Sequence, residues 1–158
     1  MISFRSSITQ PRLPEGYRLE TTPAPTAQEL DALLVSCGDR SRQPELIERV
    51  LTRSIWHLLV RDPRGQLVGF VRATSDLALN ANLWDLSAAP GDPASAAVLE
   101  VLVHGALSRL RREMAGCSIS LSAPPEALDA LRRHGFVVDP GGIRAMGLTL
   151  TDPVESVD

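Results

Sequence analysis

One stretch of the sequence combines an acidic side chain with the kind of loop that binds anions. Asp85 lies in the apolar segment 82–88, which breaks at Pro90 and is followed by a helical pattern over residues 94–114. A carboxylate on a strand can accept the proton of an incoming amine. The N-terminus of a helix carries unpaired N–H groups and partial positive charge, which favour phosphates and other anions. The stretch therefore joins a candidate base to a candidate anion site.

The other titratable side chains are weaker candidates. His57 falls in a half-buried strand pattern, His104 on the polar stripe of the long helix, and His134 at a helix end, where a partly charged imidazole is favoured. Cys37 and Cys117 stand alone, with neither a paired nor a metal-ligand spacing. We expect structural roles for all five, thiols in a reducing compartment, and no metal site. For Asp85 the alternative is also structural: a hydrogen bond to nearby backbone, or exposure to solvent.

The elements that must position these residues follow from capping and turn signals. Thr26 and Glu29 form a capping box that opens a helix ended by Gly38, and Pro44 suits the first turn of a second helix. Asp62-Pro63-Arg64-Gly65 predicts a tight turn between two strands. The expected order is strand, helix, helix, three strands, helix, strand, helix and closing strands. The strands are expected at residues 17–21, 55–62, 67–75, 81–88, 118–123, 136–138 and 143–150, and the last helix at 127–134.

Composition bounds the class of protein. The chain has 158 residues, of which 44% are hydrophobic and 22% charged, as expected for one globular domain. We place that domain at residues 15–150, between tails at 1–14 and 151–158. A net charge of −3 and an aromatic content of 4% argue against nucleic-acid binding. No apolar run is long enough to span a membrane, so we expect a cytoplasmic protein with no membrane partner.

Four features follow one another along the chain: the segment Leu83-Trp84-Asp85-Leu86, Pro90, the long helix, and the short helix ending in Arg132-Arg133-His134-Gly135-Phe136. In this order they resemble the GNAT superfamily of acyl-CoA-dependent N-acyltransferases. The resemblance covers roughly residues 17–150, and the run 135–146, GFVVDPGGIRAM, is similar to the plastid and cyanobacterial branch of that superfamily. It implies an α/β (α+β) fold with a mixed, mostly antiparallel sheet, splayed between strands 4 and 5 and flanked by about four helices.

The resemblance also implies a reaction and a set of site residues. Acetyl-CoA would be the co-substrate, and the acceptor a primary amine on a small molecule, a protein lysine or a protein N-terminus. Asp85 would act as the base. On this alignment Leu86, Ser87 and Ala88 would face the pantetheine arm, and the segment Ala94, Ser95, Ala96, Ala97 and Val98 would face the pyrophosphate. A homodimer stays open.

The chain departs from the family at two places. Typical members carry Gln/Arg-Gly-x-Gly-x-Gly/Ala where this chain has Pro93-Ala94-Ser95-Ala96-Ala97-Val98. Added methyl groups obstruct a close approach of backbone to phosphates, and proline lacks an N–H donor. Leu131 stands where many members have a tyrosine that acts as the acid, and the only tyrosine, Tyr17, is expected far from the site. The remaining acids are water, Ser118, Ser120 or Ser122, unless the thiolate leaves unassisted.

Three classes of function therefore remain open. The first is an N-acetyltransferase with a degenerate but working loop. The second is a catalytically inactive GNAT-fold binding or interaction module that has lost acetyl-CoA binding, and the third is a sensor that holds another small molecule in the splayed sheet. The altered loop and the missing tyrosine favour the second, whereas the strand and the closing segment favour the first.

Overall fold

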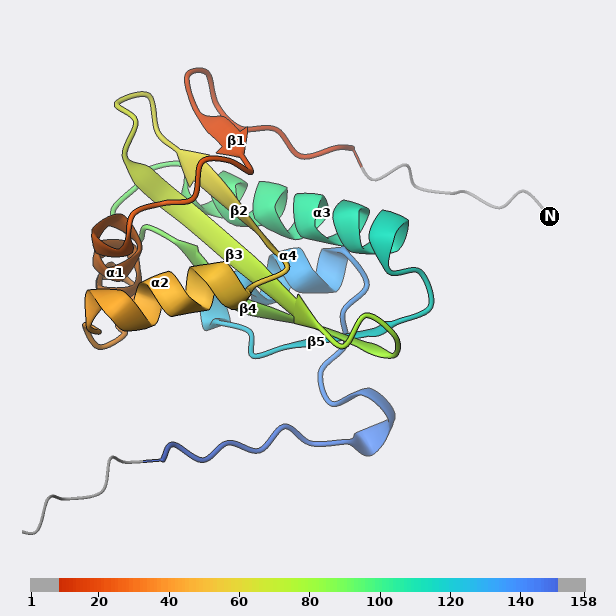
Figure 1. The fold of residues 1–158 in the computed structure, drawn as a ribbon. Helices are drawn as coiled ribbons and strands as arrows, with labels where there is room; N and C mark the ends of the chain where they lie inside the picture. Colours follow the sequence, from red (N-terminus) through yellow and green to blue (C-terminus); the bar gives the residue numbers. More distant parts are fainter. Residues whose placement is uncertain (1–8, 151–158) are drawn as a thin grey trace, which may run out of the picture.

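The computed structural model describes residues 9–150, so the predicted tail 151–158 and residues 1–8 of the predicted N-terminal tail lie outside the described residues. Five strands form one sheet in the order β1-β2-β3-β4-β5. Figure 1 shows α1 and α2 on one face of this sheet and α3 and α4 on the other. The elements are β1 (Arg18–Glu20), α1 (Ala27–Ser36), α2 (Pro44–Arg53), β2 (Trp56–Arg61), β3 (Leu67–Ser75), β4 (Asn80–Ala88), α3 (Ser95–Glu113), β5 (Ser118–Leu121) and α4 (Leu128–Arg133), with 3-10 turns η1 (Pro125–Ala127) and η2 (Pro140–Gly142).

The sheet is mixed and mostly antiparallel, as predicted. Neighbouring strands from β1 to β4 pair antiparallel, whereas β4 and β5 pair in parallel. A parallel pair needs a crossover connection, and α3 supplies it. α3 is the longest helix at 19 residues, but no helix in the described part of the chain is both long and apolar enough to cross a membrane.

Local signals in the sequence are confirmed at the first helix and at the hairpin. Thr26 Oγ1 accepts the Glu29 N–H at 3.1 Å, and Glu29 Oε2 accepts the Thr26 N–H at 2.9 Å, which completes the capping box. The turn between β2 and β3 closes with a bond of 2.9 Å from the Gly65 N–H to the Asp62 carbonyl. Gly65 has a φ of +82°, a conformation that glycine adopts without strain.

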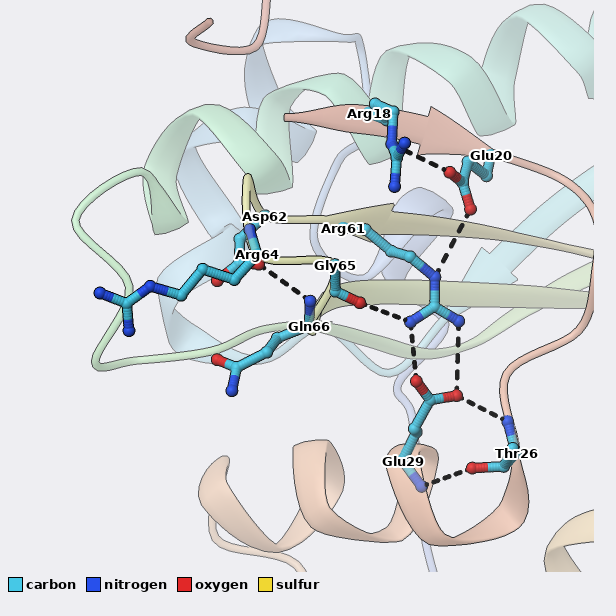
Figure 2. Close-up of polar contacts among 9 residues, drawn as sticks. All are labelled: Arg18, Glu20, Thr26, Glu29, Arg61, Asp62, Arg64, Gly65 and Gln66. Atoms are coloured by element: carbon cyan, nitrogen blue, oxygen red, sulfur yellow. Dashed lines mark hydrogen bonds and ion pairs between the residues drawn. The ribbon is translucent and has the colours of Figure 1, made fainter. Parts of the chain in front are cut away.

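Arg61 ties the first helix to this hairpin and to the first strand. Its guanidinium donates to both carboxylate oxygens of Glu29, at 2.7 and 3.3 Å, and to the Gly65 carbonyl at 3.0 Å (Figure 2). It also lies 3.5 Å from a carboxylate oxygen of Glu20. The Arg61 guanidinium and the Thr26 N–H lower the pKa of Glu29. One mostly buried cation thus fixes the position of α1 on the sheet.

Two apolar clusters lie on the two faces of the sheet. Phe70 of β3 packs with α1 and α2, while its neighbour Val71 points to the other face and packs with α3 and α4. Because helices cover both faces, β2 and β3 are apolar along most of their length, not only at alternate residues. The cavity described below lies where the α1 side and the α3 side meet, at the end of β4.

The predicted strands at 136–138 and 143–150 are wrong. The described chain after α4 forms only the turn η2. Phe136 is half-buried against the core, but the apolar side chains beyond it are exposed, with Met146 at 96% and Leu148 at 87%. Positive φ angles at Asp139, Gly141 and Gly142 turn the chain, and Figure 1 shows the segment leaving the body of the protein. Alternating apolar residues describe a surface that suits a strand, but a strand forms only where a second backbone supplies hydrogen bonds.

Candidate functional site

The sheet opens between β4 and β5. The two strands pair from Asn80 with Ser118 to Leu83 with Leu121, where β5 ends. Past Leu83, β4 has β3 as its only strand neighbour within the described residues. The segment from Trp84 to Ala88 therefore has one unpaired backbone edge, at the place where the splay was predicted.

A bulge in β4 shapes this free edge. Asp85 and Leu86 together oppose the single residue Val71 of β3, between the pairs Trp84 with Arg72 and Ser87 with Phe70. Asp85 takes a φ of +56°, in the left-handed region that aspartate tolerates better than most residues. Bulges bend a strand and redirect its side chains, and they are frequent beside functional sites. No signal in the sequence marked this bulge.

The carboxylate of Asp85 is held by a cation. Arg72 Nε lies 2.6 Å from its Oδ2, and the same guanidinium lies 5.7 Å above the ring of Trp84. The Asp85 side chain is 28% exposed, and within the described residues its Oδ1 has no hydrogen-bond partner. Asp85 therefore presents one free oxygen at the splay, while Arg72 and Trp84 fix its orientation.

A cavity of about 470 Å³ lies against the free edge. Its walls come from the end of α1 and the turn after it, from β4 at the bulge, from the start of α3, and from the segment that follows β5. Three carboxylates, of Asp39, Asp85 and Glu126, are part of the lining. A hydrogen bond from Arg42 lowers the pKa of Asp39. The lining consists of Leu34, Ser36, Cys37, Gly38, Asp39, Asp85, Leu86, Ser87, Ala88, Pro90, Ser95, Leu99, Pro124 and Glu126.

Two polar groups mark the end of the free edge. Ser87 is the only buried polar side chain in the described core, at 8% exposure, and it lines the cavity. Cys37, the C-cap of α1, points its thiol at the Ala88 carbonyl, with 3.4 Å between sulfur and oxygen. Cys37, for which the sequence predicts only a structural role, thus lies in the cavity wall. The αL turn at Gly38, which ends the helix, was the one signal that put Cys37 at a helix terminus.

The start of α3 differs from the sequence expectation in the direction of its side chains. Ala94 is the N-cap and is buried, Ser95 and Ala97 are half-buried, and Ala96 is exposed. Val98 is fully buried and packs over Gly69 of β3, where an added Cβ would overlap Val98 Cγ1. The Val98 side chain therefore fills the core and does not obstruct the loop. Whether any of these residues binds a cofactor stays a prediction.

Tyr17 lies beside this loop, which corrects the expectation that it is far from the site. Its hydroxyl donates to the Asp92 carboxylate, at 2.9 Å from Oδ1 and 3.1 Å from Oδ2. Asp92 Oδ1 also accepts the Ala94 N–H at 2.8 Å, and the Asp92 carbonyl accepts the Ser95 N–H at 3.1 Å. Partial burial and the carboxylate raise the pKa of Tyr17. The contact joins residues 75 apart, so local patterns could not reveal it.

The remaining candidates lie elsewhere. Leu131 is buried at 2% exposure in the α3 cluster, and Ser120 accepts a bond of 2.6 Å from the Asn82 side chain. His134 binds the Ala130 carbonyl at 2.8 Å and lies 5.8 Å, ring to ring, from His104. None of these lines the cavity. Within residues 9–150 no group of three histidine, cysteine or acidic side chains has the arrangement of a metal site.

Comparison with known proteins gives both relatives and structural neighbours. The chain is 32% identical over 121 residues to the uncharacterized N-acetyltransferase ycf52 of Pyropia yezoensis, an alignment that covers 75% of this chain and 68% of the relative. A probable acetyltransferase of meticillin-resistant Staphylococcus aureus, SA2161, has a TM-score of 0.75 at 16% identity, covering 85% of this chain and 99% of that one. The GNAT family N-acetyltransferase YhbS of Escherichia coli, solved in complex with CoA, has a TM-score of 0.58 at 21% identity, covering 77% and 69%. No protein-family model matches the chain.

The structural neighbours share an α+β fold with a mixed sheet, which here opens between β4 and β5 over a cavity. The alignment with ycf52 covers 68% of that relative, which is named as an N-acetyltransferase. The chain belongs to the GNAT superfamily.

Proposed function

We propose that this protein is an N-acetyltransferase that transfers the acetyl group of acetyl-CoA to a primary amine in the cavity beside β4. The observation that carries the proposal is the unpaired edge of β4 from Trp84 to Ala88, which lies against a cavity of about 470 Å³. An open edge of this kind binds an extended ligand that carries amides, because the ligand can pair with it as a further strand does. The pantetheine arm of acetyl-CoA is such a ligand.

The residues at this edge fit the arm. Backbone groups of alternate strand residues point to the same side, and the contact from Cys37 shows that the Ala88 carbonyl faces the cavity. Leu86 and Ala88 would therefore supply the backbone pairing, and the Ser87 hydroxyl would be an additional polar contact in the cavity. In this arrangement Ala94, Ser95, Ala96 and Ala97, at the first turn of α3, would be the residues nearest the phosphates. Acetyl-CoA supplies the activated thioester.

The acidic lining supports an amine as the acceptor. Asp39, Asp85 and Glu126 favour a cationic group, since an opposite charge stabilises the ammonium form on binding. Asp85 is the candidate base, because its Oδ1 is open while Arg72 holds Oδ2. In this role it takes the ammonium proton, so that the amine lone pair becomes available for the acetyl carbon. The acceptor is then a small amine, a protein lysine or a protein N-terminus.

A calorimetric titration tests the donor, and one substitution tests the base. Wild-type protein should bind acetyl-CoA and CoA with dissociation constants on the order of micromolar, or about −8 kcal/mol. In an acceptor screen, Asp85→Asn should lower kcat by about 10²-fold to 10⁴-fold while leaving donor affinity in place. Asp129→Asn, a change at a carboxylate that is 82% exposed on α4, is the matched control. Equal turnover by the Asp85 and Asp129 variants would show that Asp85 is not the base.

Three features favour a second function, an inactive GNAT-fold binding or interaction module. Asp92 places a negative charge at the start of α3, Pro93 removes an N–H donor there, and Leu131 carries no hydroxyl. If neither acetyl-CoA nor CoA binds at millimolar concentration, this second function replaces the first. Capture of protein partners, including a second copy of this chain, would then be the measurement of interest.

The proposed place of action is the cytoplasm. Cys37 and Cys117 are both free thiols, which suits a reducing compartment. Fractionation of cells that produce the full chain, followed by detection of the protein in each fraction, would test this part of the proposal.

A further inference from the structure

The N-terminus of α3 already holds an anion that belongs to the protein. The Asp92 carboxylate accepts the Ala94 N–H, and the Asp92 backbone carbonyl accepts the Ser95 N–H, so two donors at the start of the helix are in use. Pro93, between them, has no N–H. A donor phosphate would have to compete for the first of these groups and would meet a like charge beside it.

Tyr17 holds this carboxylate in place. Its hydroxyl bonds both Asp92 oxygens, and the bond is partly buried. Tyr17 precedes β1, which is paired with β2, so the restraint comes from the sheet and not from the loop itself. Asp92 is therefore held from two directions, by the backbone N–H groups of Ala94 and Ser95 at the start of α3 and by Tyr17 beside the first strand.

The free edge of β4 is unaffected by this arrangement. The groups that would hold a pantetheine arm lie at Leu86 and Ala88, on the other side of Pro90 from Asp92. The site thus has a free backbone edge for the thioester arm. At the end where the phosphates would lie, the Asp92 carboxylate occupies a helix N–H group and adds a negative charge.

We propose that Asp92 is a donor-specificity residue that makes the protein insensitive to the nucleotide half of an acyl donor, so that acyl-pantetheine thioesters without a pyrophosphate bind as well as acyl-CoA. This inference rests on the proposed acetyltransferase function. It predicts that the adenosine pyrophosphate contributes little to donor binding in the wild-type chain and that removal of the Asp92 charge restores its contribution.

Two donors and four proteins test the proposal by calorimetry. The donors are acetyl-CoA and S-acetyl-pantetheine, which share the thioester arm and differ in the nucleotide. The proteins are wild type, Asp92→Asn, Tyr17→Phe and the control Glu48→Gln, which removes one exposed charge on α2, across the sheet from α3. A thermal melt of each protein without ligand confirms that it is folded.

The expected result is a change for one donor only. Wild type and Glu48→Gln should bind the two donors within about threefold of each other. Asp92→Asn should bind acetyl-CoA at least about tenfold more tightly and S-acetyl-pantetheine within about twofold of wild type. Tyr17→Phe should give a smaller gain for acetyl-CoA, because the carboxylate remains but loses its restraint.

The outcomes separate this inference from the function on which it rests. If wild type binds acetyl-CoA far more tightly than S-acetyl-pantetheine, or if Asp92→Asn leaves that difference unchanged, the specificity role is refuted and the acetyltransferase function stands. If Asp92→Asn weakens both donors alike, Asp92 is only a structural cap, which also refutes the role. If no protein binds either donor, both the function and the inference fall.

Discussion

The packing of Val98 over Gly69 predicts a strong energetic coupling between α3 and β3. A methyl group at Gly69 would overlap Val98 Cγ1 and would lie 3.1 Å from Leu102 Cδ1 and 3.2 Å from Val60 Cβ. All three neighbours are nearly or fully buried, so the surroundings cannot move toward solvent. Overpacking of this kind costs about 1–3 kcal/mol. The loss is reduced by about 0.5 kcal/mol because alanine is less flexible than glycine in the unfolded chain.

Truncation of the valine gives the second arm of a double-mutant cycle. Val98→Ala removes two carbons, which is about 1.6 kcal/mol of transfer free energy at about 0.8 kcal/mol per group, and about 2 kcal/mol once a residual cavity is included. Alone, Gly69→Ala should cost about 0.5–2.5 kcal/mol. In the double variant the new methyl group occupies the space that the valine leaves, so the free energy of unfolding should fall by only about 2 kcal/mol. The coupling is then about 0.5–2.5 kcal/mol in favour of the pair.

Urea unfolding and thermal melts measure this cycle directly. For a chain of this size, about 1 kcal/mol corresponds to about 2–4 °C in Tm. Gly147→Ala is the control, since a Cβ there meets nothing within 4 Å. Additive losses in the double variant, or a Gly69→Ala protein as stable as wild type, would show that the helix does not pack on the strand in this way.

Four further results are expected. Val98→Gly should lower stability by about 3 kcal/mol in urea unfolding, from the lost side chain and a helical glycine, without raising affinity for acetyl-CoA in calorimetry; a gain in affinity would mean that the side chain faces the loop after all. Arg61→Gln should lower the free energy of unfolding by about 1–3 kcal/mol, because the Glu29 carboxylate loses its charged partner; a loss below about 0.5 kcal/mol would contradict the contacts shown in Figure 2. Burial lowers the pKa of His57 below its ordinary 6.5, so the unfolded chain binds the proton more tightly and stability should fall as pH drops below about 6.5; His57→Gln should flatten this slope between about pH 5.5 and 7.5, and an unchanged slope would refute the assignment. Alkylation of Cys37 by a maleimide should slow in the presence of acetyl-CoA if the donor lies on the free edge, with Cys117 as the internal control, and equal protection of both thiols would point to a global effect.

Local signals in the sequence predict the elements that depend only on residues close together in the chain. The Thr26 capping box and the Asp62 to Gly65 turn each involve residues within four positions of each other, and both are confirmed. The family resemblance predicts a splay between strands 4 and 5, and the pairing of β4 with β5 ends at Leu83, before the end of β4.

Features that depend on contacts between distant residues could not be predicted. Tyr17 reaches Asp92 across 75 positions, and nothing in either local sequence indicates the contact. The alignment that placed Val98 in the phosphate loop carried no information on which side of the helix faces the core. The segment 143–150 has the alternation of a strand, but alternation does not supply a partner strand. Each of these features is set by tertiary contacts, which residue propensity does not describe.

The brief parallel pairing of β4 with β5 has a consequence for the order of folding. The neighbouring strands β2, β3 and β4 are linked by short turns, whereas Asn80 meets Ser118 only after α3 has crossed the sheet, a separation of 38 residues. Closing a loop of that length costs more chain entropy than closing a hairpin, and only four residue pairs reward it. We expect β5 to dock late, in the kinetic phase that also builds the wall of the cavity. A nascent chain would therefore hold a formed hairpin before it holds any site, and the ability to bind a ligand would report the last step of its maturation.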